Sequence, residues 1–273
     1  MKSPIRYYGG KSHMLKEIIS LFPPHKTYVE PFGGGAHVLI SKQPSELEIY
    51  NDIDENLVNL FMVLKDPDKF YKLYKLLLLT PYSKEEFEYS KETLNSTQND
   101  IENAYKYFIM SRMSFNGLFK SNWAYARNKS CGGMSSQTSS WLNGTENLPL
   151  IHKRLQSVII ENEDFREIFK KYSAEDVLIY ADPPYVPDTR VSKSAYKYEL
   201  TLDDFDDLVR ILLETKSKII LSNYRHEFFE RLEKHNWKRI DIEKSVHASI
   251  GRGNTRNKRI ESIWINFDKP KLL

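Results

Sequence analysis

Apolar residues in the first fifty positions alternate between a helical and a strand-like period. Residues 11–21 place apolar side chains on one helical face, and two consecutive prolines end this pattern shortly afterwards. Residues 27–30 and 48–51 predict two short strands, and residues 36–41 predict a helix between them. The order strand, turn, helix, strand is typical of a sheet with parallel strands.

The next part of the chain is dominated by helical periodicity. Local signals mark two helix starts, namely Asp66 followed by Pro67 and Ser83 followed three residues later by Glu86. Residues 114–144 are rich in Gly, Ser and Asn, and we expect them to form a long functional loop or to contain a hairpin. The predicted helices are residues 54–64, 66–79, 83–94 and 100–113.

Strands and helices alternate again in the second half of the chain. The last two predicted strands, 237–243 and 260–267, flank a basic loop and favour an antiparallel hairpin. The other predicted elements are strands at residues 158–161, 177–181 and 218–222 and helices at residues 165–172, 201–214 and 227–235.

These patterns together predict an α/β fold. We expect a Rossmann-like, mostly parallel sheet with a C-terminal antiparallel hairpin, interrupted after its second strand by a mostly helical insert. Residues 1–59 and 157–273 are predicted to form one domain, and residues 60–156 the inserted subdomain.

Composition narrows the class of protein. The chain has 273 residues and 40% hydrophobic content, enough for a large domain with an insert. Its single cysteine excludes a disulfide framework and a Cys-rich zinc module, and the seven histidines show no metal-binding spacing. The start of the chain has no apolar signal region, and apolar runs such as residues 76–79 are far too short for a membrane span. We therefore expect a soluble cytoplasmic protein without a metal centre.

Positive charge is concentrated in two stretches of a nearly balanced chain. There are 40 Lys and Arg residues against 37 Asp and Glu residues, a net charge of +3. Residues 103–145 contain no acidic residue but several cations and many aromatic residues, and residues 249–259 form a second acid-free stretch. Local cations of this kind favour a polyanionic partner, although solvated loops would also explain each stretch taken alone.

A glycine-rich turn, Gly33–Gly35, lies between the first predicted strand and its helix. Glycines let the backbone approach a ligand closely, and Asp52 follows the next strand, where an acid would accept the hydroxyls of an adenosine ribose. Val38 breaks a strict Gly-x-Gly-x-x-Gly pattern, so the turn alone could be structural. Gly10-Lys11-Ser12 is not a phosphate-binding loop, because Ile5 stands where that motif needs glycine.

The strongest chemical signal is Asp182-Pro183-Pro184-Tyr185, directly after the buried strand 177–181. The prolines stiffen the backbone and leave nearby carbonyls free to accept hydrogen bonds. The carboxylate of Asp182 is a second acceptor, and Tyr185 offers a flat face for stacking. This combination is suited to recognising a planar amine by its NH2 group, with a plain proline turn as the alternative.

Several motifs of the chain resemble those of Dam-like, D12-class DNA adenine-N6 methyltransferases. Residues 182–185 match the catalytic signature of amino-group DNA methyltransferases, and residues 30–35 are similar to their cofactor motif. The order of the motifs also fits that family. The remaining similar segments are Tyr7 to Lys11, Phe115 to Leu118, Asn162 to Phe165 and Leu221 to Tyr224.

The resemblance implies a set of roles around S-adenosylmethionine. Asp182 and the Pro183 carbonyl would bind the target N6 amine, with Pro184 in the same turn and Tyr185 stacked on a flipped base. Asp52 would hold the ribose, Asp164 would accept from the cofactor adenine, and Phe165 would pack on that ring. The residues implied around the rest of the cofactor are Tyr7, Lys11, Glu30, Phe32, Gly33, Gly35 and Asp182.

The same resemblance implies double-stranded DNA as the partner, gripped by the basic insert and the terminal loop. It implies a monomer or weak dimer on DNA, in some members beside a cognate restriction enzyme, in a bacterial or phage-infected cell. The candidate DNA contacts are Arg112, Asn116, Lys120, Arg127, Lys129, Arg252, Arg256 and Lys258.

Other functions are left open by the residues themselves. Cytosine N4, RNA adenine or a protein amide is also a planar amine, and Asp rather than Ser or Asn at position 182 favours adenine by resemblance only. A nicotinamide-dependent oxidoreductase would use the glycine turn and Asp52 but not residues 182–185. A DNA-binding relative without activity is a third alternative. Residues 135–141 resemble divergent phage and restriction-associated members, so methylation of GATC does not follow.

Overall fold

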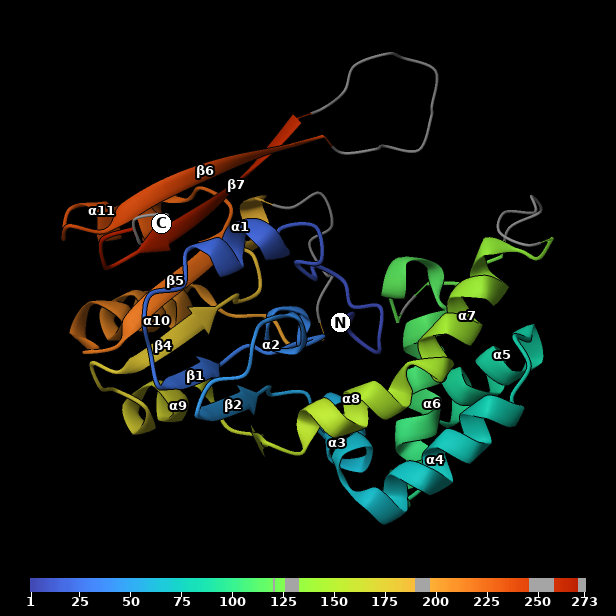
Figure 1. The fold of residues 1–273 in the computed structure, drawn as a ribbon. Coiled ribbons are helices and arrows are strands. Elements are labelled where there is room, and N and C mark those ends of the chain that lie inside the picture. Colours follow the sequence, from blue (N-terminus) through green and yellow to red (C-terminus); the bar gives the residue numbers. More distant parts are fainter. Residues whose placement is uncertain (120, 126–132, 190–196, 246–257, 270–273) are drawn as a thin grey trace.

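The computed structural model describes residues 1–119, 121–125, 133–189, 197–245 and 258–269. Its centre is a seven-stranded sheet with the strand order β3-β2-β1-β4-β5-β7-β6 (Figure 1). The first five strands of this order are parallel, and β7 is antiparallel to both β5 and β6. The strands are β1 Thr27–Glu30, β2 Leu47–Asn51, β3 Val158–Glu161, β4 Val177–Ala181, β5 Lys218–Asn223, β6 Lys238–Ser245 and β7 Lys258–Ile265. The predicted mostly parallel sheet with a C-terminal hairpin is confirmed.

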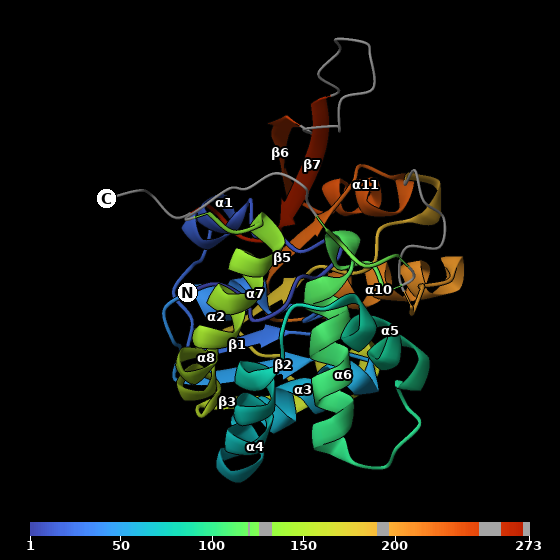
Figure 2. The same cartoon turned by 90° about the vertical axis from the view of Figure 1, so that its right-hand side faces the viewer.

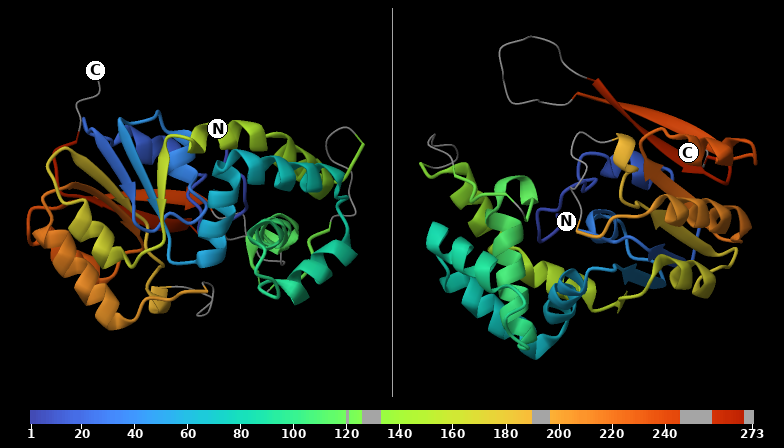
Figure 3. Two further views of the ribbon diagram at one scale, coloured as in Figure 1. Left: turned by 90° about the horizontal axis from the view of Figure 1, so that it is seen from below. Right: turned by 180° about the vertical axis from the view of Figure 1, so that it is seen from behind.

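Alternate residues of the central strands face opposite sides of the sheet, as the pleat requires. Tyr28 and Tyr180 belong to one apolar core, and Val29 and Ile179 belong to the other. Each core is closed by its own helices, which lie on the two sides of the sheet in Figure 3. The helices are α1 Leu15–Ser20 and α2 His37–Ser41 on the first side, and α9 Phe165–Lys171, α10 Leu202–Glu214 and α11 Glu227–Glu233 on the second.

The described part of the segment between β2 and β3 contains six α-helices, most of which stand beside the sheet (Figures 1 and 2). The helices that carry Phe61 and Ile151 also pack against the sheet and belong to the first core. Polar side chains begin five of the six helices: Asp54, Asp66, Ser83, Asn99 and Ser135 each accept a hydrogen bond from a backbone N–H in the first turn. The predicted boundaries at residues 60 and 156 stay a prediction. The helices are α3 Glu55–Lys65, α4 Pro67–Leu79, α5 Lys84–Thr93, α6 Asp100–Met113, α7 Ser136–Glu146 and α8 Leu148–Leu155.

The expectation of a loop or hairpin over residues 114–144 is wrong for its second half. Helix α7 begins at Ser136, after a cap in which Ser135 accepts from the backbone N–H of Thr138 at 3.1 Å. Its Ser, Thr, Asn and Gly content gives it weak helix propensity. Burial of Trp141 against Phe108 compensates for this weak propensity, because an aromatic side chain contributes a large apolar area to the core. The first half contains a short 3-10 helix, Phe115–Gly117, and an isolated bridge between residues 114 and 123.

Among the described residues, no helix combines the length and the apolar character that crossing a membrane requires. The same part of the chain contains no group of three His, Cys, Asp or Glu side chains arranged to hold a metal ion.

Candidate active site

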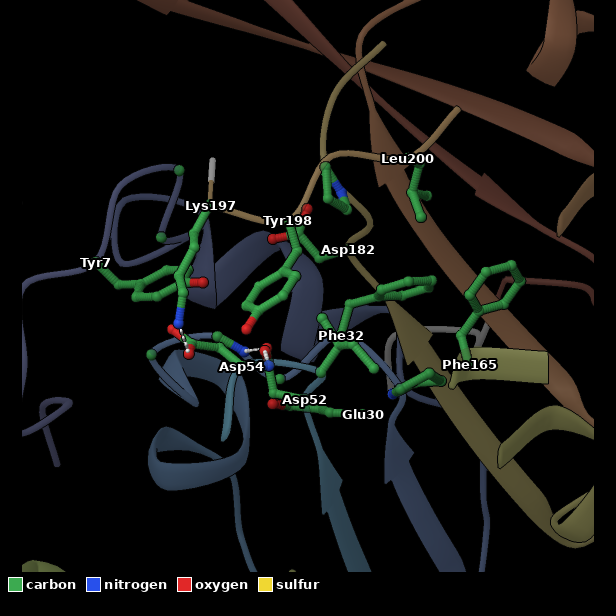
Figure 4. A pocket seen from close by; sticks show the side chains of 18 of the residues that line it. Tyr7, Glu30, Phe32, Asp52, Asp54, Phe165, Asp182, Lys197, Tyr198 and Leu200 are labelled. Carbon is green, nitrogen blue, oxygen red and sulfur yellow. Dashed lines mark hydrogen bonds and ion pairs between the residues drawn. The ribbon is translucent and has the colours of Figure 1, made fainter. Parts of the chain in front are cut away.

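A pocket opens where β1, β2 and β4 end, because parallel neighbouring strands bring their carboxyl ends to one edge (Figure 4). The turn after β1, Asp52 after β2 and Asp182 after β4 therefore share one wall. The N-terminal loop and residues 197–200 supply the rest of the lining around Tyr7 and Tyr198. Segments far apart in the chain are thus joined in one site.

The glycine turn is shaped by close contacts. Gly34 has φ +47, and a Cβ atom there would lie 2.8 Å from the Tyr7 ring. A side chain at this position would therefore meet both backbone strain and a clash. The Gly34 N–H donates to Asp52 Oδ2 at 2.8 Å, and the Tyr50 hydroxyl donates to the Gly34 carbonyl at 2.8 Å. These bonds hold the turn against the end of β2.

Asp52 is buried and held on both carboxylate oxygens. Its Oδ1 accepts from the backbone N–H of Asp54 at 2.9 Å, in addition to the Gly34 bond at Oδ2. Burial raises the pKa of Asp52 to about 6, against the lowering effect of these backbone donors. Asp54, in turn, accepts from Lys197 Nζ at 2.8 Å and from the Tyr107 hydroxyl at 3.2 Å. Asp54 therefore connects β2, α6 and the segment that covers the pocket (Figure 4).

Glu30, at the end of β1, is a buried acid with neutral hydrogen-bond partners. Its Oε1 accepts from the Tyr28 hydroxyl and from the Leu39 N–H, each at 2.7 Å. Burial raises the pKa of Glu30 to about 8, so the side chain is mostly protonated at neutral pH. Glu30 lines the pocket as predicted, and it also fixes helix α2 to β1.

His37 begins helix α2 and is held between two glycines. A Cβ atom at Gly10 or at Gly35 would lie 2.5 Å or 2.6 Å from its ring, so both positions need glycine. Burial lowers the pKa of His37 to about 4, helped by the positive charge of Lys11. The imidazole in this wall of the pocket is therefore neutral at physiological pH.

One end of the pocket is aromatic. The rings of Phe32 and Phe165 pack with centroids 5.3 Å apart. Asp164 begins α9 by accepting from the Arg166 N–H at 2.8 Å, and its carboxylate forms an ion pair with the Arg166 guanidinium at 3.1 Å. A flat apolar surface beside a carboxylate is suited to an aromatic ligand that carries an amino group.

Asp182 also lines the pocket, and one of its carboxylate oxygens is tightly bound. Lys11 Nζ donates to its Oδ1 at 2.6 Å, and Ser222 Oγ donates to the same oxygen at 2.8 Å. Burial raises the pKa of Asp182, and the Lys11 charge and the two hydrogen bonds partly offset this effect. Lys11 is itself buried, 2% exposed, and its second contact is the Gly9 carbonyl at 3.3 Å. A partly buried acid with a buried cationic partner in a pocket is a common feature of catalytic sites.

The rest of the Asp-Pro-Pro-Tyr turn only partly reaches the pocket, because Tyr185 is not in its lining. Pro184 lines the pocket, while Pro183 is buried behind it. Tyr185 is 7% exposed and its ring lies 4.4 Å from that of Tyr224, centroid to centroid. Lys11 Nζ lies 4.6 Å from the centroid of the Tyr185 ring. The tyrosine is therefore part of a packed aromatic group.

All ten residues predicted to bind the cofactor line this one pocket, although their individual roles stay predictions. Sequence reasoning missed His37, Asp54, Lys197 and Tyr198 in the lining. It also missed Ser222, whose signal was its place at the end of the strand that follows the Asp182 strand. Lys11 was expected near the cofactor, and the structure adds its ion pair with Asp182.

The predicted DNA contacts are mostly beyond what the structure describes. Arg112 packs inside the helical insert, where its Nη2 donates to the Ser140 carbonyl and to the Ser140 hydroxyl, and burial lowers its pKa to about 10. Asn116 lies in the short 3-10 helix, and Lys258 is the first residue of β7. The candidates outside the described residues are Lys120, Arg127, Lys129, Arg252 and Arg256.

A family model and several curated proteins that are similar to this chain all point to the same family. The model of the D12 class N6 adenine-specific DNA methyltransferases matches residues 7–247. The type II methyltransferase M1.LlaDCHI of Lactococcus lactis subsp. cremoris is 27% identical over 283 residues, which cover 96% of this chain and 94% of that protein. The DNA adenine methylase of Haemophilus influenzae is 27% identical over 187 residues, with coverages of 67% and 63%. That of Vibrio cholerae is 24% identical over 265 residues, with coverages of 93% and 92%.

The match extends from the N-terminal loop that carries Lys11, through the glycine turn and the helical insert, past Asp182 to the end of β6. Methyl transfer requires a methyl donor, and the pocket brings the sequence motifs for donor and acceptor to one edge of the sheet. Adenine rather than cytosine is the target base that this family model specifies. The chain therefore belongs to the D12 class of N6 adenine-specific DNA methyltransferases.

Proposed function

We propose that this enzyme takes the methyl group from S-adenosylmethionine and transfers it to the N6 amine of an adenine that has left a short duplex motif. The observation that carries the proposal is the single pocket that joins the glycine turn, Asp52 and Asp182. The donor would lie along the carboxyl ends of β1 and β2, and the target base beside β4.

The chemistry of the pocket fits S-adenosylmethionine. Asp52, in the pocket lining, would accept the ribose hydroxyls, and Phe32 and Phe165 would offer an apolar surface for the adenine ring. The donor carries a positively charged sulfur, which a charged imidazole would repel. His37 is neutral at physiological pH, and Asp182 adds a carboxylate near the transfer site.

Asp182 and the Pro183 carbonyl would accept the two hydrogens of the target amine. The lone pair of an exocyclic adenine nitrogen is delocalised into the ring, which makes the nitrogen a poor nucleophile. Two acceptors that hold its hydrogens favour a pyramidal nitrogen whose lone pair points at the methyl group. Positioning in line and stabilising the positive charge that develops on the nitrogen then lower the barrier.

The protons and electrons of this step balance without a covalent enzyme adduct. The nitrogen lone pair forms the new bond to the methyl carbon, and the electrons of the broken bond stay on sulfur. The nitrogen then loses one hydrogen as a proton, and the carboxylate of Asp182 would receive it. Lys11 at 2.6 Å favours the charged form of that carboxylate and offsets part of the effect of burial on its pKa.

A base inside a duplex cannot reach a pocket at the edge of a sheet, so we propose that the adenine flips out. Tyr185 would stack on the flipped base and offset part of the cost of unstacking. The helical insert, predicted as residues 60–156, would contact the phosphates and read the motif, together with the basic loop between β6 and β7.

The test compares the wild-type chain with Asp182→Ala in cells that lack other DNA methylation. Sequencing of the DNA for modified bases should show N6-methyladenine in one short motif with the wild-type chain and none with the variant. A parallel titration with S-adenosylhomocysteine should show that both proteins still bind the donor product. Full methylation by Asp182→Ala would overturn the assignment of Asp182, and methylation of another base would overturn the target.

A further inference from the structure

Ser222 is a fully buried hydroxyl that lies directly beside Asp182. It is near the end of β5, which pairs in parallel with β4 so that Ala181 is opposite Leu221. The residue after each of these two therefore lies at the same level of the sheet edge. The Ser222 hydroxyl donates to Asp182 Oδ1 at 2.8 Å.

The two donors to Asp182 share one of its oxygens. Lys11 Nζ also binds Oδ1, at 2.6 Å, and neither of these bonds goes to Oδ2. Two donors from different elements, the N-terminal loop and β5, restrict rotation of the carboxylate about its Cβ–Cγ bond. The remaining oxygen is then held in a defined direction.

Tyr180, on β4, sets the direction of the Ser222 hydroxyl. Its own hydroxyl lies 3.0 Å from Ser222 Oγ, and it is buried at 4% exposure. Burial raises the pKa of Tyr180 well above its usual range, so the phenol keeps its proton and can donate. When Tyr180 donates to Ser222, the serine proton is available for Asp182. The three residues form a chain of hydrogen bonds that ends at the catalytic carboxylate.

We infer that Ser222 is a positioning residue of the methyl transfer: with Lys11 it holds Oδ1 of Asp182, so that Oδ2 is presented to the target amine. This inference rests on the proposed role of Asp182 as the acceptor of that amine. Tyr180 acts one step further away, through Ser222.

The hydrogen bond from Ser222 is one of several interactions that set the pKa of Asp182. Burial raises the pKa of Asp182, and Glu261 on β7 raises it further. Glu30 on β1 is mostly protonated at neutral pH, and His13 Nε2 lies 3.5 Å from Glu261. Lys11 and Ser222 act in the opposite direction and lower the pKa of Asp182. Loss of the serine hydroxyl should therefore raise it.

The experiment is single-turnover methylation of a duplex by Ser222→Ala, measured as a function of pH. We expect the rate of the chemical step to fall about tenfold or more, as for a lost hydrogen bond to a charged group. The acidic limb of the pH profile should move to higher pH, since less Asp182 is ionised. The affinity for S-adenosylmethionine should be unchanged, because Ser222 does not line the donor pocket.

Ser262→Ala is the matched control. Ser262 is equally buried, lies in the same sheet on β7, and its hydroxyl donates to a carboxylate, Asp241 Oδ1, at 2.7 Å. The same methyl-for-hydroxyl replacement there should leave both the rate and the pH profile as in the wild type. Tyr180→Phe is the second variant. We expect a smaller fall in rate than in Ser222→Ala, and a shift of the acidic limb to higher pH as in that variant.

The outcomes separate this inference from the proposed function. A wild-type rate and acidic limb in Ser222→Ala would overturn the positioning role, provided that Asp182→Ala is inactive. If Ser222→Ala does not fold, Tyr180→Phe decides in the same way, since it leaves the serine and the carboxylate in place. Full activity of Asp182→Ala would instead show that the proposed acceptor itself is wrong.

Discussion

Two acids at the ends of neighbouring strands, Glu30 fully buried and Asp182 partly buried, have different partners. Glu30 receives hydrogen bonds from a tyrosine hydroxyl and a backbone N–H, and its pKa is raised to about 8. Asp182 is bound by the Lys11 ammonium and by the Ser222 hydroxyl. A cationic partner favours the charged form of an acid, whereas neutral donors compensate burial less well. From these different partners we expect Asp182 to act on the substrate amine and Glu30 to be a neutral structural acid.

The state of Glu30 predicts how stability depends on pH. Its pKa in the folded protein, about 8, exceeds the ordinary value of 4.5, so the folded state binds the proton more tightly than the unfolded chain. The stabilisation is complete below about pH 4.5 and is lost as the pH rises towards 8. We expect Glu30→Gln, which cannot ionise, to remove this loss, on the order of a few kcal/mol.

Urea unfolding at several pH values between 4.5 and 8 measures this effect. The variant should gain in free energy of unfolding relative to the wild type as the pH rises. Asp164→Asn is the comparison, because this carboxylate is half exposed and has a cationic partner. Equal slopes for Glu30→Gln and the wild type would show that Glu30 is charged in the folded protein.

At the scale of the elements, α7 shows how burial overrides local preference. The Ser- and Asn-rich sequence from residue 136 to residue 146 does not favour a helix by itself. Trp141 is 2% exposed. Its Nε1–H donates to the carbonyl of Thr80, the C-cap residue of α4, at 3.1 Å. One aromatic side chain thus connects α7 to α4 and α6, and it contributes much of the reason why this segment is helical.

Trp141→Ala should therefore destabilise the helical insert. We expect the free energy of unfolding to fall by about 3–5 kcal/mol, the usual cost of removing a buried aromatic side chain. Circular dichroism during thermal or urea unfolding would measure the loss. Leu142→Ala is the control on the same helix, since Leu142 is 40% exposed. Equal stabilities of the two variants would contradict the role given to Trp141.

At the scale of the whole molecule, the helical segment is joined to the sheet by a buried ion pair. Arg154 of α8 donates to both oxygens of Glu48 on β2, at 2.6 and 2.8 Å, and to the Leu39 carbonyl at 2.8 Å. Lys42 also binds Glu48. Burial disfavours the charge of Glu48, but the hydrogen bonds from Arg154 and Lys42 outweigh it and lower its pKa. The pair sets how the last insert helix returns to the sheet.

Removing one partner of this pair should be costly, because the remaining buried charge loses its compensation. We expect Arg154→Met to lower the free energy of unfolding by about 3–5 kcal/mol. Lys153→Met on the same helix is exposed and should change stability by less than about 0.5 kcal/mol. Unfolding in urea would compare the two variants, and a stable Arg154→Met protein would show that Glu48 is satisfied by Lys42 alone.

The sequence by itself determined the order of strands and helices in the sheet domain, and its motifs picked out ten of the residues that line the pocket. Strand and helix periods are local, and parallel strands necessarily bring the turn at residue 33, Asp52 and Asp182 to one edge. Only the tertiary structure decided that α7 is a helix, that Lys11 pairs with Asp182, and that Ser222 supports the same oxygen. These depend on contacts between residues far apart in the chain, and neither composition nor periodicity encodes which distant side chains will be buried together.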